Sequence, residues 1–306
     1  MNRRYVLRRL VHGIFILWLV TVTVFMMIHI VPGDPARMML GDRAREHDVE
    51  ELRTKLGLDR PLPEQYMVFV SGIVVGDFGE SIRAQRPVSE LVSTALPATL
   101  LLLGSSLLLA FTVGIPLGVL AGVHRGGIAD KLALVLSLIG QSVAPFWLGL
   151  MLISFFSVKL GILPTSGIGG FRHLVLPVLA LAPTAMGMVL RVTRVSVIEV
   201  MNENYIRTAV SKGMRPITVV WKHGMKNASI PIITVVGLQI GTLLGGAIVT
   251  ETVFAWPGIG RLAVNSLIQR DWPVVRTVVL LSAITLVIMN FLIDMTYAAI
   301  DKRVQF

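Results

Sequence analysis

Long apolar stretches alternate with short polar ones along this chain. A helix needs about 20 apolar residues to cross roughly 30 Å of hydrocarbon. Six stretches are long and apolar enough: Leu10–Ile30, Ala98–Val123, Leu132–Val158, Leu174–Leu190, Ile232–Phe254 and Val278–Ala299. The pattern therefore predicts an all-α polytopic membrane protein with six transmembrane helices. Composition agrees, because 15% of the residues are charged against about 25% in a soluble domain.

Basic residues fix the expected orientation. The first apolar stretch is too long for the h-region of a signal peptide, which has about 7–15 residues, so it is predicted to stay as a helix. The short segments 1–9, 124–131, 191–231 and 300–306 carry most of the Lys and Arg of the short loops. This positive-inside bias predicts a multi-pass membrane protein with both termini in the cytoplasm. It also accounts for the net charge of +10 without a nucleic-acid partner.

The expected domain organisation follows from these spans. Residues 1–31 form an N-terminal transmembrane helix, 32–97 an extracytoplasmic helical region, 98–299 a domain of five transmembrane helices, and 300–306 a cytoplasmic tail. Within the second region, helical periodicity is predicted for Asp48–Leu56 and from Pro63 onward. Val88–Ala95 is expected to lie along the membrane surface. This region is either a small cap on the first helix or a docking surface for an external protein.

A basic, amphipathic stretch interrupts the apolar pattern on the cytoplasmic side. We call Tyr205–Asn227 the amphipathic segment. Asn204 is predicted to be an N-cap, and a short helix is expected up to Lys212. Gly213 follows, where a left-handed residue is needed, and Pro216 is suited to the first position of a second helix. The sequence therefore predicts a helix–turn–helix that is presented to a partner.

Small residues recur at every fourth position in two of the spans. They are Gly114, Gly118 and Gly122 in the second span and Gly237, Gly241 and Gly245 in the fifth. Little hydrophobic force acts between helices in lipid, so close approach over small residues drives their association. These glycines are predicted to pack helices together inside the bundle.

Catalytic and metal-binding chemistry is not indicated by the sequence. Cysteine is absent, and the six histidines have no metal-ligand spacing. No P-loop pattern exists, so the chain does not bind ATP by that motif itself. Gly258–Ala263 matches a dinucleotide fingerprint but follows a span instead of a strand. Glu251 and Asp294 stand near span ends, where a structural role is expected rather than a proton relay. A conduit driven by an ATP-hydrolysing partner is the first interpretation.

The amphipathic segment resembles the EAA loop of ABC importer permeases, here residues 195–231. Arg207-Thr208-Ala209, then Gly213, then His223–Asn227 match its spacing, although Arg207-Thr208 replaces Glu-Ala and Lys226 replaces the common proline. Those departures resemble the dipeptide, oligopeptide and nickel branch of the family. Three further segments agree with that branch: Val31–Pro35, Gly76–Gly79 and Glu251–Gly260.

The resemblance implies a type I ABC importer permease of the bacterial cytoplasmic (inner) membrane, with four kinds of partner. These are a second, usually non-identical permease subunit, two ATP-binding subunits that hold ATP and Mg, an extracytoplasmic solute-binding protein, and membrane lipid. This chain would hold no cofactor or metal and perform no catalysis. The coupling residues carried over from the family pattern are Tyr205, Arg207, Thr208, Ala209, Lys212, Gly213, His223 and Asn227. Ala209 is expected to allow close approach to the ATPase, while Arg207 and Lys212 either pair with it or only set topology.

The expected function is ATP-driven import of dipeptides or oligopeptides by alternating access. Glutathione or a nickel chelate remains an alternative within the same class, since selectivity in such systems lies largely in the binding protein. An ATP-independent channel or secondary carrier is the alternative of a different class. A midplane site for a coupling ion, which a secondary carrier needs, has no good candidate here.

Overall fold

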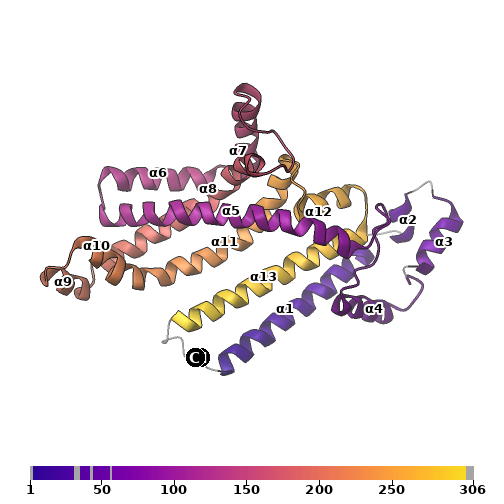
Figure 1. The fold of residues 1–306 in the computed structure, drawn as a ribbon. Helices are drawn as coiled ribbons and strands as arrows, with labels where there is room; N and C mark the ends of the chain where they lie inside the picture. Colours follow the sequence, from indigo (N-terminus) through magenta and orange to yellow (C-terminus); the bar gives the residue numbers. More distant parts are fainter. Residues whose placement is uncertain (1–2, 31–34, 42–43, 56, 301–306) are drawn as a thin grey trace. The chain divides into compact units, whose positions relative to one another are not determined.

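The structure is a computed structural model that describes residues 3–30, 35–41, 44–55 and 57–300. It is built from helices, as Figure 1 shows, and the described part contains one isolated β-bridge, between Glu80 and Pro87. The helices are α1 (Arg3–Ile30), α2 (Pro35–Leu40), α3 (Glu46–Lys55), α4 (Leu62–Val75), α5 (Val88–Val123), α6 (Ile128–Ser142), α7 (Pro145–Leu152), α8 (Phe171–Met201), α9 (Asn204–Ser211), α10 (Pro216–Thr218), α11 (Met225–Val253), α12 (Ile259–Ile268) and α13 (Trp272–Ile300), with two π-helical stretches, η1 (Ile153–Lys159) and η2 (Val219–Gly224). Most of the predicted Val31–Pro35 motif, the 301–306 tail and the side chain of Asp294 lie outside the described residues.

The chain forms two compact units. The first comprises residues 1–7, 100–256 and 289–306, and the second comprises 8–99 and 257–288. In the first unit α8 is the central helix, because α5, α6, α7 and α11 all pack against it. Buried apolar side chains follow one another along most of its length, among them Leu176, Leu181 and Leu190. The core of this unit is therefore built around α8.

The predicted membrane spans correspond to helices of sufficient length and hydropathy. Among the described residues, five helices qualify alone, and a sixth span forms if α6 and the helix beginning at Pro145 are counted together. The third predicted stretch is not one straight helix, because these two parts meet at an angle of 99°. Proline lacks an N–H and disfavours helical geometry in the preceding residue. Ala144 accordingly has φ −65° and ψ 133°, and α6 ends at Ser142.

Two helices are longer than the predicted spans. Val88–Ala95, which were expected to lie along the membrane surface, form the first turns of the 36-residue α5 and are continuous with the second span. The helical run Pro216–Val253 has 38 residues, or roughly 57 Å at 1.5 Å per residue. Such a run is about twice the thickness of the hydrocarbon. Part of this run therefore extends beyond the hydrocarbon if the helix crosses it upright.

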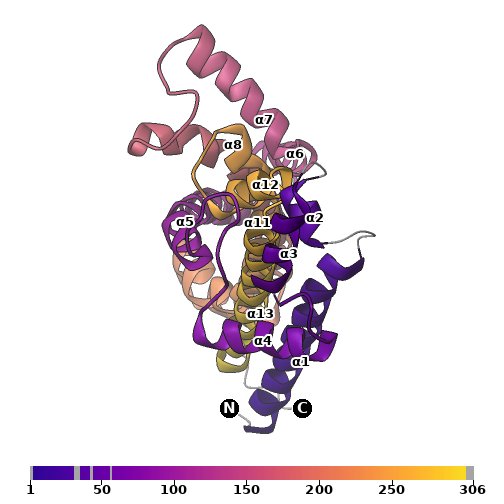
Figure 2. The ribbon, with the colours of Figure 1, turned by 90° about the vertical axis from the view of Figure 1, so that its right-hand side faces the viewer.

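The second unit is organised around α1 and α13, which run side by side (Figure 1). A Cβ placed on Gly13 of α1 would lie 3.4 Å from Val287. Val88 and Val92 at the start of α5 pack against Val274 and Val278 of α13. Figure 2 shows α4 lying across α1. The periodicity prediction holds for α3 and α4, but α4 buries none of its side chains.

Candidate functional site

The amphipathic segment begins with the short helix α9, as predicted, but its cap differs. The N-cap is Glu203, in an extended conformation, and no side chain caps the helix. Asn204 is already helical, so the prediction that it is the N-cap is wrong. The Asn204 carbonyl instead accepts a hydrogen bond from Thr208 Oγ1 at 3.0 Å. Thr208 is thus partnered within its own helix.

One face of α9 is buried by the chain itself. Ile206 and Ala209, three residues apart, are 2% and 7% exposed and pack with Val219 of η2. Residues at this spacing share one face of a helix. Ala209 was expected to meet a partner surface, but its small side chain instead lets α9 approach η2. Partly buried residues complete the cluster: Val200, Met201 and Met214.

Gly213 ends α9 in a Schellman motif. Its φ is +74°, and its N–H donates to Val210 O at 2.9 Å, while Met214 N–H donates to Ala209 O at 3.4 Å. These two bonds satisfy carbonyls that the end of a helix leaves free. A side chain at Gly213 would meet no atom within 4 Å. Backbone conformation, and not space, therefore favours glycine here.

The second half of the segment returns to the bundle. Pro216 occupies the first turn of α10, as predicted, and η2 leads into α11. Asn227 Nδ2 donates to the Tyr205 hydroxyl at 2.7 Å, joining the start of α9 to α11. His223 lies in η2 with its Nε2 buried and without a hydrogen-bond partner among the described residues. Tyr205 and Asn227 thus join α9 to α11, and His223 lies in η2 between them along the chain.

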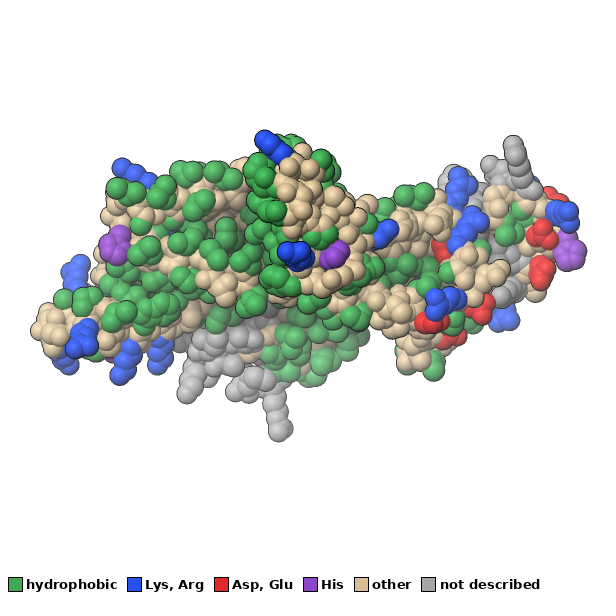
Figure 3. All heavy atoms as spheres, turned by 45° about the horizontal axis from the view of Figure 1, so that its top comes forward, with side chains coloured by type: hydrophobic (Ala, Val, Ile, Leu, Met, Phe, Trp, Pro, Cys, Tyr) green, Lys and Arg blue, Asp and Glu red, His purple; other side chains and the backbone are tan. Residues whose placement is uncertain are grey.

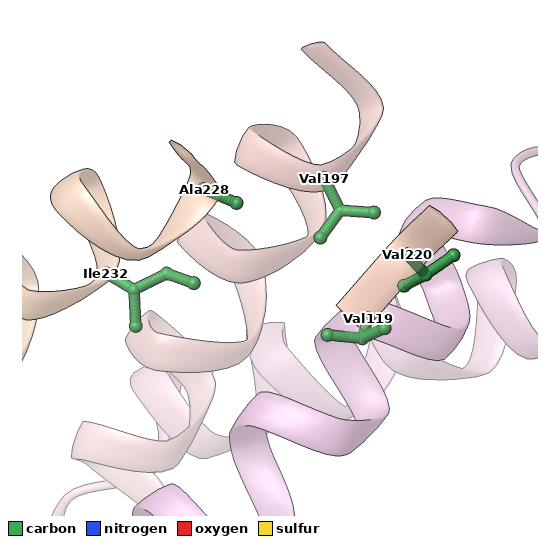
Figure 4. Close-up of a cluster of buried hydrophobic side chains, with 5 residues drawn as sticks. All are labelled: Val119, Val197, Val220, Ala228 and Ile232. Atoms are coloured by element: carbon green, nitrogen blue, oxygen red, sulfur yellow. The ribbon is translucent and has the colours of Figure 1, made fainter. Parts of the chain in front are cut away.

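A buried apolar cluster connects the segment to three long helices. Figure 4 shows its members, which are Val119 of α5, Val197 of α8, Val220 of η2, and Ala228 and Ile232 of α11. All five are at most 7% exposed. Protein interiors pack densely and transmit strain. A displacement of η2 is therefore felt by α5, α8 and α11 together.

The exposed surface of the segment is basic and polar in part, and it also carries the apolar side chains of Val210, Ile217 and Trp221, which are 58%, 67% and 53% exposed. Arg207, Thr208 and Lys212 are exposed, and so is about two fifths of Tyr205. Figure 3 shows basic side chains gathered at the end of the bundle formed by α9 and α10. Four of the predicted coupling residues thus share a solvent-exposed surface. Ala209 and Gly213 shape the helix that carries them.

The predicted glycines differ in what they contact. Added side chains at Gly118 and Gly122 would lie 2.6 and 2.8 Å from Thr193 and Val197, respectively, and one at Gly114 would lie 3.2 Å from Met186 O. These three glycines therefore let α5 approach α8 closely. In α11, Gly237 is buried, Gly241 is half-buried, and Gly245 has open space around it. The close approach of α11 to α8 is at Gly246, where an added side chain would lie 2.9 Å from Leu181.

One structural pair was missed by reasoning from the sequence. Arg194 of α8 donates to both carboxylate oxygens of Asp130 at the start of α6, through Nε and, at 2.9 Å, through Nη2. Asp130 also accepts from Gly126 N at 2.9 Å. The positive-inside bias explains Arg194 only as a residue that sets membrane topology. The sequence signal for this pair was an aspartate in the first turn of one span and an arginine near the end of another.

Metal-ligating side chains do not cluster in the described residues. Within them, no group of three or more His, Asp or Glu side chains is arranged to hold a metal ion. Glu251 is fully buried, at 0% exposure, at the end of α11.

Comparison with solved structures defines the fold. The chain matches the MetNI methionine ABC transporter in its inward-facing crystal form with a TM-score of 0.59 and 22% identity, over 69% of this chain and 96% of that one. An amino acid ABC transporter crystallised with histidines gives a TM-score of 0.53 and 16% identity. At these identities the likeness establishes the fold, which is that of type I ABC importer permeases.

The family is established by sequence. Residues 114–306 match the binding-protein-dependent transport system inner membrane component, and residues 2–103 match the N-terminal region of such membrane components. The chain belongs to this family and is a permease subunit of an ABC importer. It is 42% identical over 302 residues, 99% of each chain, to the glutathione transport system permease protein GsiC of Escherichia coli K12. The protein of that name from Pectobacterium atrosepticum is equally similar.

Proposed function

We propose that this permease imports short peptides, with glutathione as the first candidate, by ATP-driven alternating access. The 42% identity to a glutathione transport permease over 99% of both chains supports this substrate class. Glutathione is itself a tripeptide, so the expected peptide specificity and the relative's substrate agree. The complex would contain a second permease subunit, two ATP-binding subunits that hydrolyse ATP, and an extracytoplasmic solute-binding protein.

The coupling proposal rests on one observation: helix α9 is exposed to solvent on one side and packed against its own chain on the other. Arg207, Thr208 and Lys212 would face a cleft of an ATP-binding subunit in the cytoplasm. Burial of Ile206 and Ala209 against η2 keeps α9 in place without the partner. Docking then needs little reordering of this chain, which lowers the cost of association. Both termini would be cytoplasmic, in keeping with the basic residues of the same loops.

Motion of the ATP-binding subunits would reach the pathway through packed side chains. A shift of α9 displaces η2 through the contact of Ile206 with Val219, and η2 is continuous with α11. Val220 carries the same displacement to Val119 and Val197, on α5 and α8. ATP binding would thereby tilt these helices and open the pathway outward, and hydrolysis would reset it.

Single-cysteine cross-linking tests the coupling surface directly, because the natural chain has no cysteine. Thr208→Cys should cross-link to a cysteine placed in the cleft of an ATP-binding subunit, with a yield that changes on ATP binding. Ser166→Cys, exposed in the α7–α8 connection, is the matched control and should not cross-link. A membrane-impermeant maleimide added to intact cells should label the Ser166 variant and spare Ser211→Cys. The reverse labelling pattern would refute the orientation.

Reconstitution tests the substrate and the energy source. The complex and its binding protein are placed in proteoliposomes, and uptake of labelled glutathione, a dipeptide and a nickel chelate is compared with and without ATP. We expect ATP-dependent uptake of a peptide. Mass spectrometry of ligand that co-purifies with the binding protein identifies the native substrate. Uptake without ATP-binding subunits would support the channel or carrier alternative instead.

A further inference from the structure

A cavity of about 370 Å³ lies in the second unit. Its wall includes Phe25 of α1, Phe69 of α4 and Arg276 of α13, together with Arg60 and Asp77. Small-ligand sites are commonly about 300–1,000 Å³. The cavity is thus large enough for the polar group of a small molecule or lipid.

Arg276 supplies a cation that has no ion-pair partner among the described residues. Its guanidinium carbon lies 4.6 Å from the centroid of the Phe69 ring, over its face. Its Nε is buried and has no hydrogen-bond partner among the described residues. Asp77 lines the same cavity, but its carboxylate accepts from Gly79 N at 2.9 Å and makes no ion pair with Arg276 in the described structure. Burying an unpaired charge is costly, so an anion from outside this chain would stabilise the site.

The depth of Arg276 along its helix matches the headgroup level of a bilayer. It is four residues from Trp272, where the span of α13 begins, or roughly 6 Å along the axis. Tryptophan is typical of membrane interfaces, and arginine near a helix end directs its charge toward the headgroups. The guanidinium fork suits the two oxygens of a phosphate.

Helix α4, which borders the cavity, exposes apolar side chains at the cavity's edge. Val68, which lines the cavity, and Val75, seven residues later on the same face of the helix, are 56% and 81% exposed. At 14 residues α4 is too short to span a bilayer, and an apolar helix of this length is typical of interfacial segments. Its other face packs on α1, where Tyr66 bonds Thr21 at 2.9 Å and its ring meets Phe25 edge-on. Both of those α1 residues lie within the Val6–Met27 span.

We propose that this cavity is a phospholipid site, with the lipid phosphate on Arg276 and the acyl chains along the exposed face of α4. The contacts with α1 hold α4 at membrane depth, and its apolar face there needs acyl chains rather than water. In the proposed topology this is the extracytoplasmic leaflet. The site is separate from substrate transport, so its test does not depend on the peptide proposal.

Native mass spectrometry of the intact, detergent-purified complex tests the site. Wild type should retain phospholipid through delipidation, and Arg276→Gln should retain about tenfold less, the loss expected on removing a charge-assisted hydrogen bond. Arg172→Gln, an exposed arginine at the start of α8, is the matched control and should retain wild-type lipid. Equal retention in all three complexes would overturn the proposal. So would an Arg276→Gln complex that keeps its lipid but loses ATPase stimulation by the binding protein, since a protein carboxylate would then be the partner.

A second test measures the melting temperature of the wild-type complex with added lipid. It needs no variant, so it still tests the proposal if the Arg276→Gln complex fails to assemble. A short-chain phosphatidylglycerol should raise the melting temperature. Diacylglycerol with the same chains, and inorganic phosphate alone, should not. Equal stabilisation by diacylglycerol would show that no phosphate is recognised. Equal stabilisation by inorganic phosphate would show a free-anion site in place of a lipid site.

Discussion

Replacement of Gly213 by valine separates backbone geometry from packing. The residue has φ +74°, and an added Cβ would meet nothing within 4 Å. A side chain therefore causes no clash, and the whole effect of Gly213→Val comes from the left-handed backbone. The two Schellman hydrogen bonds and the position of Met214 depend on that conformation.

The size of the effect follows from the cost of the left-handed region. For a residue with a Cβ it is roughly 1–2 kcal/mol, and 1.4 kcal/mol is about a tenfold change in population. The native turn should thus become about 5- to 30-fold less favoured relative to alternative turns. Valine should lie at the upper end because it is β-branched, and Gly213→Ala at the lower end. Membrane insertion should be unchanged, since the turn lies between spans.

The assay is ATP hydrolysis in proteoliposomes, stimulated by the loaded binding protein. We expect stimulation to fall in the order glycine, alanine, valine, with equal amounts of permease in the membrane. Gly161→Val is the matched control, because Gly161 has φ +66° and equally open space but lies after η1, far along the chain from α9. Full stimulation in Gly213→Val would refute the coupling role of this turn. Equal loss in both variants would assign the effect to general destabilisation.

Three other changes test parts of the same framework. Asp130→Asn leaves Arg194 without its anion and should cost about 3–5 kcal/mol, seen as a lower melting temperature that the additional change Arg194→Met largely restores. Gly118→Leu overpacks the α5–α8 contact and should destabilise the subunit by about 1–3 kcal/mol, whereas Gly104→Leu, with open space around it, should not. Tyr205→Phe removes the hydrogen bond from Asn227 of α11, which is worth about 1 kcal/mol. Stimulated ATPase activity should therefore fall by less than in Gly213→Val, with unchanged expression. An equal or larger loss would contradict this magnitude.

Much of the fold is predictable because the bilayer imposes simple requirements. Membrane spans can be predicted from their length and hydropathy. Gly213 and Pro216 predict the end of one helix and the start of the next, because their backbone preferences are local. The bend at Pro145 was also present in the sequence as a local signal. Apolar residues continue on both sides of it, however, so hydropathy alone hides a 99° change of direction.

Contacts between helices determine the features that the sequence alone does not predict. Periodicity alone does not say whether the small side chain of Ala209 faces a partner or the chain's own η2. Only the packing of α9 on Val219 shows that it faces inward. The pair formed by Asp130 and Arg194 joins residues 64 positions apart, and the charge bias offers a complete but different reason for the arginine. Likewise Arg276 looked like one of the few basic residues of an outer loop until the structure placed it beside Phe69.

The arrangement of α9 argues that shape, more than charge, transmits force at this surface. An exposed ion pair from Arg207 or Lys212 is worth about 0–1 kcal/mol and weakens with salt. Full burial of a large apolar side chain such as Ile206 is worth about 1.5–3 kcal/mol, and it is made inside the chain, where salt does not reach. A partner that pushes on α9 therefore moves η2 before α9 detaches from it. The basic residues can then orient docking, while the apolar contacts beneath them carry the displacement to α5, α8 and α11.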